Sequence, residues 1–252
     1  MPPAAPLENA APPLSQIERV VNTFIAPRKT FEDIRRSASW WLPWILGTLA
    51  AMAFLFTVEK KIGYEEIVNG RFAHASLLQR VTAQMSPEKK QEMIDQQVAR
   101  SHSNLYTAPL FNLGFALIFA LILNTTFNFG LDAQIRYAAS LAVVFYAWLP
   151  KIISAAFAVL VMMLGVEPEG FDMENPVATH LGALLGSNTD HRYLYHLLTA
   201  VDLFSFWWIF LAGLGFATIS KRKISTGAAV TVVASWYVVF ILLRLALTPV
   251  MG

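Results

Sequence analysis

The sequence predicts an all-α, polytopic integral membrane protein. We expect five transmembrane helices in a bundle, with an N-terminal amphipathic helix and an extramembrane helical hairpin. Composition is the first observation behind this prediction: of the 252 residues, 56% are hydrophobic and only 14% are charged, whereas a soluble protein of this size is about one quarter charged. The second is that the apolar residues form long runs, because a helix of about 20 apolar residues crosses a bilayer's hydrocarbon core.

The N-terminal region is predicted to be a short disordered segment followed by an amphipathic helical one. Residues 1–13 are rich in Pro and Ala and lack the basic and apolar stretches of a cleavable signal peptide, which we therefore do not expect. Residues 14–37 begin with a capping box of Ser15 and Glu18 and alternate apolar and basic positions at helical spacing, with an interruption at Pro27. This cytoplasmic segment suits either the headgroup layer or packing on the protein's own membrane domain.

The membrane domain is predicted to occupy residues 38–252, with five apolar runs long enough to span a bilayer. Trp40, Trp41 and Trp44 form an aromatic belt where the first run begins. Residues 178–186 are apolar but too short to cross, so we expect them to be re-entrant or interfacial. In chain order, the predicted spans are about 40–58, 106–130, 137–165, 197–219 and 226–250.

The positions of Lys and Arg predict the orientation of the spans. Residues 221–223 (KRK) fill the turn between the fourth and fifth spans, and Arg28, Lys29, Arg35 and Arg36 precede the first span. The positive-inside rule places both groups, and with them the N-terminus, in the cytoplasm. The acidic loop 166–196 and the C-terminus then face outward, and so do residues 59–105, although they carry seven basic residues.

Residues 59–105 are predicted to form the helical hairpin outside the bilayer. Ser86 is a favourable helix cap with Pro87 at the first helical position, and residues 89–100 follow without a helix breaker. A second helical stretch is expected before it, at about residues 72–85. The charged face of this hairpin is either a solvated surface or a docking surface for a partner.

Three charged residues lie inside predicted spans, where each costs about 2.5–3.5 kcal/mol on insertion scales. Asp202 in the fourth span and Arg244 in the fifth are expected at a similar depth, because the two spans form an antiparallel hairpin. They form a candidate intramembrane charge pair. The alternative is that Arg244 extends to the outer surface by itself and Asp202 faces water.

The third charge, Lys151, lies in the middle of the third span and directly after Pro150. Proline removes a backbone hydrogen bond and kinks a helix. A kinked helix with a buried cation is typical of a polar cavity, so Pro150 and Lys151 are candidate cavity residues. The alternative is a tilted helix in which Lys151 meets a loop carbonyl or Asp202.

The sequence gives no indication of an enzyme, a cofactor or a metal site. The chain has no cysteine, and a net charge of +2 does not favour nucleic acid. The outer loop carries histidines and acidic residues, but they lack a recognised metal-ligand spacing. Gly213 and Gly215 are better explained by close helix contacts than by a nucleotide site. The loop residues considered as metal ligands were His180, His191, His196, Asp172, Glu174 and Asp190.

Asn104, Leu105, Tyr106 and Pro109 directly precede the second span. They resemble the DLYGP signature of the YIP family, small multi-span membrane proteins named for binding Ypt/Rab GTPases. Here Asn104 stands in place of Asp, and residues 107–108 (TA) stand in place of Gly. In eukaryotic members this signature opens the first span, whereas here it precedes the second.

Further similarity is to bacterial members of the family, in residues 27–31, residues 40–43 and the stretch from Asp202 to Trp208. The resemblance implies a five-span helical bundle with a cytosolic N-terminus. It also implies a non-catalytic role in membrane organisation or trafficking. A bacterial member need not have a Rab partner, so that binding activity is not transferred.

Two functions remain open from the sequence. The first is a non-enzymatic protein of the bacterial inner membrane that organises lipids, other membrane proteins or further copies of itself. The second is a small transporter or permease subunit that uses Lys151 and Asp202 in a polar pathway. This second function would require oligomerisation, because the chain is short for a complete transporter.

Overall fold

The computed structural model describes residues 12–74, 83–165, 172–173, 175–186 and 191–251. Within these ranges the regular elements are helices, with one isolated β-bridge between His180 and Asp202. Four stretches are long and apolar enough to cross a membrane: α3 (Trp41–Lys61), α6 (Pro87–Leu131), the pair α7 (Tyr137–Ala147) and α8 (Leu149–Met163), and α11 (Thr226–Met251). A fifth apolar helix, α10 (Leu203–Ile219), is shorter. The chain is therefore an all-helical, multi-pass membrane protein.

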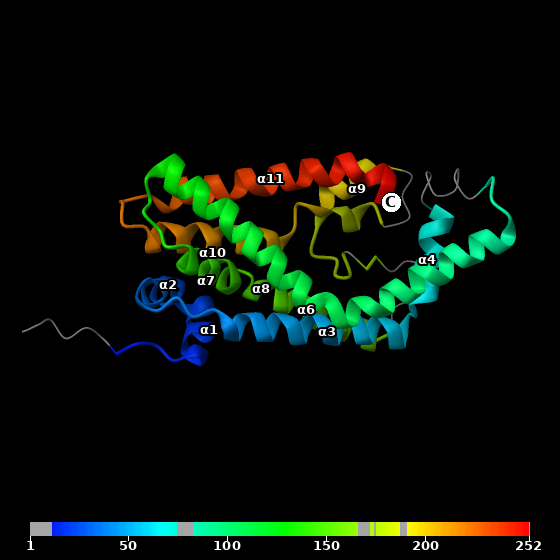
Figure 1. Cartoon of the computed structure of the whole chain (residues 1–252), viewed down its shortest axis with the longest axis horizontal. Coiled ribbons are helices and arrows are strands. Elements are labelled where there is room, and N and C mark those ends of the chain that lie inside the picture. Colours follow the sequence, from blue (N-terminus) through cyan, green and yellow to red (C-terminus); the bar gives the residue numbers. More distant parts are fainter. Residues whose placement is uncertain (1–11, 75–82, 166–171, 174, 187–190, 252) are drawn as a thin grey trace, which may run out of the picture.

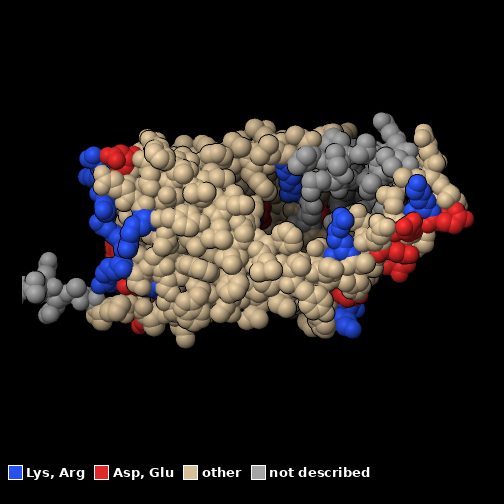
Figure 2. Space-filling view, viewed as in Figure 1, with Lys and Arg blue, Asp and Glu red and all other residues tan. Residues whose placement is uncertain are grey.

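The helices form an elongated bundle (Figure 1). In this view α3 and α11 run along opposite sides of the bundle, and α6 crosses it diagonally. Figure 2 shows Lys and Arg side chains gathered at the end where α2 lies, next to a broad belt of uncharged residues. At this end the guanidinium of Arg222 contacts the carboxylate of Asp132 at 2.6 Å, which joins the loops after α10 and α6. The charge distribution thus follows the long axis, as expected for a bundle that spans a bilayer.

The centre of the bundle is α7, whose residues 139–147 are all buried. A helix that is apolar on every side is stable only when neighbours surround it. Helix α7 ends at Trp148, and α8 begins directly after it with Pro150 in its first turn. Proline is tolerated there because the first amide groups of a helix have no partner inside the helix. The third predicted span is therefore two helices that meet at residues 148–150.

Glycine allows α10 to approach its neighbours closely. A Cβ atom on Gly213 would lie 2.6 Å from the Cα of Val230 on α11, and one on Gly215 would lie 2.6 Å from the Val143 side chain on α7. Phe216 of α10 also stacks on Phe127 of α6, with ring centroids 4.5 Å apart. The contacts at Gly213 and Gly215 show the close approach of helices that was predicted from these two glycines.

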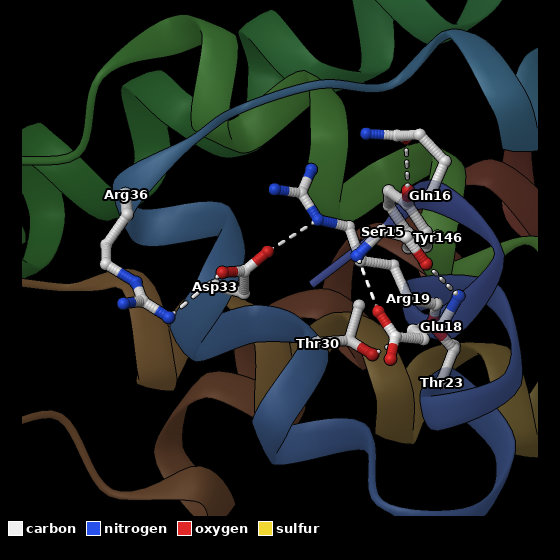
Figure 3. A network of polar contacts seen from close by, with 9 residues as sticks. All are labelled: Ser15, Gln16, Glu18, Arg19, Thr23, Thr30, Asp33, Arg36 and Tyr146. Atoms are coloured by element: carbon white, nitrogen blue, oxygen red, sulfur yellow. Dashed lines mark hydrogen bonds and ion pairs between the residues drawn. The ribbon is translucent and has the colours of Figure 1, made fainter. Parts of the chain in front are cut away.

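The N-terminal segment forms two helices, α1 (Gln16–Ile25) and α2 (Pro27–Arg36), which pack against the basic end of the bundle. Figure 3 shows how Arg19 of α1 reaches Asp33 of α2, at 2.6 Å, with both side chains almost fully buried. The hydroxyl of Tyr146 on α7 donates to the amide oxygen of Gln16 at 3.0 Å. Phe31 and Ile34 of α2 belong to the main core. Packing on the protein's own membrane domain thus holds this segment.

Residues 59–105 contain α4 (Tyr64–His74), which packs on the first half of α6 through Val68 and Ile94. Helix α6 runs unbroken from residue 87 to residue 131 and contains Pro109. The helix expected after Ser86 and the second predicted span are therefore one helix. The stretch expected at 72–85 lies mainly outside the described residues.

Candidate functional site

The site is built around the start of α10. Helix α10 has 17 residues and spans about 25 Å by helix rise, less than the ~30 Å hydrocarbon core. Asp202 caps it: its Oδ2 accepts the backbone N–H of Ser205 at 2.8 Å. The preceding chain returns to this point, because the β-bridge joins His180 to Asp202. The fourth predicted span, 197–219, is therefore a shorter helix whose first turn starts at an acidic cap.

The return segment contains the short η2 (Leu181–Leu184) and α9 (Arg192–Thr199). It is tied to the bundle by hydrogen bonds at its end: the hydroxyl of Tyr237 on α11 donates to the carbonyl of Ala200 at 2.9 Å. Gly182 lies so close to Thr199 that a Cβ would approach its methyl group to 2.8 Å. This segment fills the space beyond the end of α10.

Asp202 forms its ion pair with Lys151. The ammonium Nζ lies 3.2 Å from Oδ2 of Asp202 and donates to the hydroxyl of Ser205 at 3.0 Å. Ser205 in turn donates to Oδ2 at 3.0 Å, and the Thr179 hydroxyl donates to Oδ1 at 2.7 Å. The carboxylate therefore accepts four hydrogen bonds, and a carboxylate has about four lone-pair positions. Three of these hydrogen bonds go to Oδ2 and one goes to Oδ1, so Oδ1 keeps one acceptor position.

Lys151 can donate a further hydrogen bond. An ammonium carries three donors, and the described residues that accept from it are Asp202 and Ser205. Its side chain is 46% exposed, while that of Asp202 is 12% exposed. The lysine therefore has one N–H that faces open space.

That space is a cavity of ≈ 590 Å³ between α3, α6, α8, α10 and α11. Figure 2 shows the surface hollowed midway along the molecule, in the area where Figure 1 has α6 and α11. The walls are mainly apolar and aromatic, and Lys151, Asp202 and Arg244 are the charged side chains among the described residues that line the cavity. A largely apolar wall with a few convergent polar groups is the usual composition of a small-molecule site.

Among the described residues of α3 that line the cavity, two buried polar atoms have no hydrogen-bond partner. They are the indole Nε1 of Trp44 and the hydroxyl of Thr48, both buried, one turn apart on α3. Thr57, further along the same helix, satisfies its hydroxyl by donating to the carbonyl four residues earlier. Leaving a buried polar group without a partner costs about 1–3 kcal/mol. Neither atom has accessible surface in this structure, so an acceptor in the cavity reaches them through a rotamer change of the two side chains.

The structure brings some of the predicted site residues together in one cavity. Asp202, Lys151 and Arg244 all line the cavity, and Pro150 begins the helix that carries Lys151. A contact between Lys151 and Asp202 was one of the alternatives considered for this lysine. Asp202 forms its ion pair with Lys151 rather than with Arg244. The physical reason is that Asp202 begins α10 instead of lying within it, which turns its carboxylate toward α8.

The signature residues lie elsewhere. Asn104, Leu105, Tyr106 and Pro109 form consecutive turns of α6, where Tyr106 is 77% exposed. They do not line the cavity, which α6 reaches first at Asn112. They therefore belong to the outward-facing surface of the bundle.

Sequence reasoning missed Thr48, Thr179 and Ser205. A signal existed for Ser205, because an Asp followed three residues later by a polar donor is a helix-cap pattern. Within the described residues, no three His, Asp or Glu side chains are placed to hold a metal ion. Glu174 and Asp190, considered as ligands above, lie outside the described residues.

Comparison with known proteins gives one match. A family model described as the Yip1 domain matches residues 21–246, a range that includes every residue lining the cavity. No curated protein and no solved structure matches the chain.

Proposed function

Since the chain belongs to the Yip1-domain family, we propose that it is a non-enzymatic membrane protein that organises partners at its basic end. Proteins of this family are generally non-enzymatic membrane trafficking proteins. The observation that carries the proposal is the fixed position of α1 and α2, which are joined by the buried Arg19–Asp33 pair and held on the bundle by Phe31 and Ile34. Side chains on a surface held in this way keep one arrangement, which reduces the entropic cost of docking.

We define the basic end surface by its exposed cations. A surface of this charge attracts acidic protein segments and anionic headgroups. Two of its members are also held by ion pairs, Arg36 to Asp33 at 3.0 Å and Arg222 to Asp132 at 2.6 Å. The residues of the basic end surface are Arg28, Lys29, Arg35, Arg36, Lys221, Arg222 and Lys223.

Helix α1 adds an apolar stripe beside this surface. Ile17 and Ile25 are 71% and 74% exposed, and Val21 between them is 48% exposed. The opposite face of α1 is polar and buried, because Arg19 and Thr23 face α2. Val20 and Phe24 of α1 pack on the bundle, and this orientation supports entry of the exposed apolar stripe into the headgroup boundary of the same membrane.

Charge reversal tests the proposal. In native membranes, cross-linked partners are quantified by mass spectrometry for the full chain and for the variant Arg28→Glu/Lys29→Glu. The matched control is Lys60→Glu/Lys61→Glu, two exposed lysines at the far end of α3. We expect the first variant to lose its specifically cross-linked proteins and the control to keep them. Equal partner sets in both variants would rule out the basic end surface as a docking surface.

We also propose that this end faces the cytoplasm of a bacterial inner membrane and that the C-terminus faces outward. The positive-inside rule supports this orientation. Because the chain has no cysteine, single-cysteine labelling reports it directly. Lys223→Cys should react with an impermeant maleimide after permeabilisation only, and Gln91→Cys should react in intact cells. The reverse pattern would invert the topology.

A second candidate function is a small transporter or permease subunit. The cavity with Lys151 and Asp202 in its wall supports it. In that case the Lys151→Met variant should abolish uptake of a substrate into proteoliposomes. An organiser with the same substitution should keep its cross-linked partners, so the two functions are distinguishable.

A further inference from the structure

We propose that the cavity between α3, α6, α8, α10 and α11 binds one anionic lipid. Its phosphate or carboxylate headgroup would accept hydrogen bonds from Lys151 and from the Trp44–Thr48 pair. Its hydrocarbon would lie along the aromatic wall and leave the cavity toward the bilayer. This inference goes beyond the organising role, because it concerns a site distinct from the basic end surface.

The polar groups of the cavity favour a ligand that accepts hydrogen bonds. Asp202 accepts hydrogen bonds from Thr179, Ser205 and Lys151, and its charge is already paired with that of the lysine. Lys151 has a remaining N–H. A ligand with several oxygen acceptors and a negative charge matches these groups, because charge-assisted hydrogen bonds are about twice as strong as neutral ones.

The orphan atoms on α3 are an independent observation. The indole Nε1 of Trp44 is a donor and never an acceptor, and it is buried without a partner. The Thr48 hydroxyl lies one turn further along the same helix and is also buried without a partner. Native structures satisfy nearly all buried polar groups, so such a pair in a cavity wall indicates a missing ligand atom. An oxygen of the headgroup can accept from both.

The position of the cavity favours a lipid over a water-soluble anion. Helices α6 and α11 are joined near the basic end, where the indole of Trp236 donates to Thr126 at 3.0 Å. Further along, Phe115 and Phe240 meet edge to face at 6.4 Å, and both are about half exposed. Both rings line the cavity. In Figure 2 the hollow borders the belt of uncharged residues, which faces hydrocarbon in a membrane, and charged side chains lie at its rim.

The size of the cavity agrees with partial insertion. Its volume of ≈ 590 Å³ lies within the range of about 300–1,000 Å³ that is usual for small-ligand sites. A headgroup and the first part of its chains fit this space, and the remaining chain length lies between α6 and α11 or in the bilayer. Gly47 lines the same wall, and a Cβ there meets nothing within 4 Å. A larger side chain at this position would therefore fill the cavity.

The test is native mass spectrometry of the full chain in mild detergent, delipidated and then titrated. The probes are phosphatidylglycerol, phosphatidylcholine with the same chains, and inorganic phosphate. We expect one phosphatidylglycerol to bind about tenfold more tightly than phosphatidylcholine, or tighter still, because a hydrogen bond to a charged group is worth about a factor of ten in affinity. Inorganic phosphate should not compete. Equal binding of the two lipids would refute anionic selectivity, and competition by phosphate alone would refute a lipid ligand.

Variants connect the binding to the cavity. Lys151→Met should weaken phosphatidylglycerol by about tenfold or more, and the exposed Lys61→Met, at the end of α3, should not change it. Trp44→Phe removes the indole donor and Gly47→Leu fills the cavity, while both retain Lys151 and Asp202. Each should reduce binding with an unchanged melting temperature in the lipid-free state, or a raised one. If these two variants bind the lipid as the wild type does, the site lies elsewhere and the proposal is wrong.

Discussion

Replacing Asp33 with Ala is expected to loosen the packing of α1 on α2. The carboxylate of Asp33 is 1% exposed and contacts the Nε of Arg19 at 2.6 Å and the guanidinium of Arg36 at 3.0 Å. The Arg19 side chain is 2% exposed, so removal of its partner leaves an uncompensated buried charge. Breaking a buried pair in this way costs about 3–5 kcal/mol. We expect the free energy of unfolding of the α1–α2 unit to fall by that amount.

The double variant Arg19→Met/Asp33→Leu separates the effect of one unpaired buried charge from the effect of removing the ion pair as a whole. Apolar replacement of both members of a buried ion pair is often neutral or stabilising. Here one guanidinium nitrogen of Arg19 is buried without a partner, which makes the replacement more favourable. The double variant should therefore recover most of the stability lost in Asp33→Ala. In a double-mutant cycle of these substitutions, the double variant should lose much less stability than the sum of the losses in the two single variants.

The assay is hydrogen exchange of residues 15–36 in detergent, together with thermal unfolding of the whole chain. Glu32→Ala is the matched control, because Glu32 is the exposed neighbour of Asp33 on α2. Asp33→Ala should raise exchange across both helices, whereas Glu32→Ala should leave it unchanged. If the two variants exchange alike, the buried pair does not hold the N-terminal segment and the reasoning above fails.

Three further predictions concern packing, charge and pH. Gly213→Ala should destabilise the protein by about 1–3 kcal/mol in thermal unfolding, because its Cβ meets the backbone of α11; Gly114→Ala, with open space around it, should be neutral or stabilising by up to about 1 kcal/mol. Asp202→Asn should retain the helix cap but leave the lysine uncompensated, lowering stability by about 1.5–3 kcal/mol; an unchanged melting temperature would contradict this. Hydrogen bonds from the Ser15 backbone and hydroxyl hold the pKa of Glu18 below its usual value. A depressed carboxyl pKa means that this capping contribution is complete at neutral pH and is lost as pH falls through the lowered pKa. Glu18→Gln, which has no titrating carboxyl group, should therefore remove the acid sensitivity of α1 exchange.

Local signals predicted several elements well. The capping box at Ser15 is present with both of its hydrogen bonds, and Pro150 lies at a break in the third apolar run. The run beginning at Thr226 forms one long helix. Each of these features depends on residues within a few positions of one another, and such short-range chemistry is readable from sequence.

The start of α10 was harder to predict, because it depends on distant residues. Hydropathy alone extends the fourth span back to residue 197, since the residues there are apolar. The structure instead returns the chain at Asp202, where Thr179 and Lys151 supply partners from 23 and 51 residues away. A cap pattern was available in the sequence, but the partners that make an acidic cap stable below the membrane surface were not. Similarly, Pro109 does not interrupt α6, although proline often ends a helix.

The division of roles between Asp202 and Lys151 follows from their hydrogen bonds. Asp202 caps α10, holds the return segment through Thr179 and neutralises Lys151, so both of its carboxylate oxygens serve the fold. A carboxylate so engaged is poorly suited to relay protons or to bind a cation. Its effect is to hold the lysine ammonium in one place, with a remaining N–H toward the cavity. Because the acid serves the fold and the base keeps free capacity, the chemistry offered to a ligand in this membrane site is that of a hydrogen-bond donor.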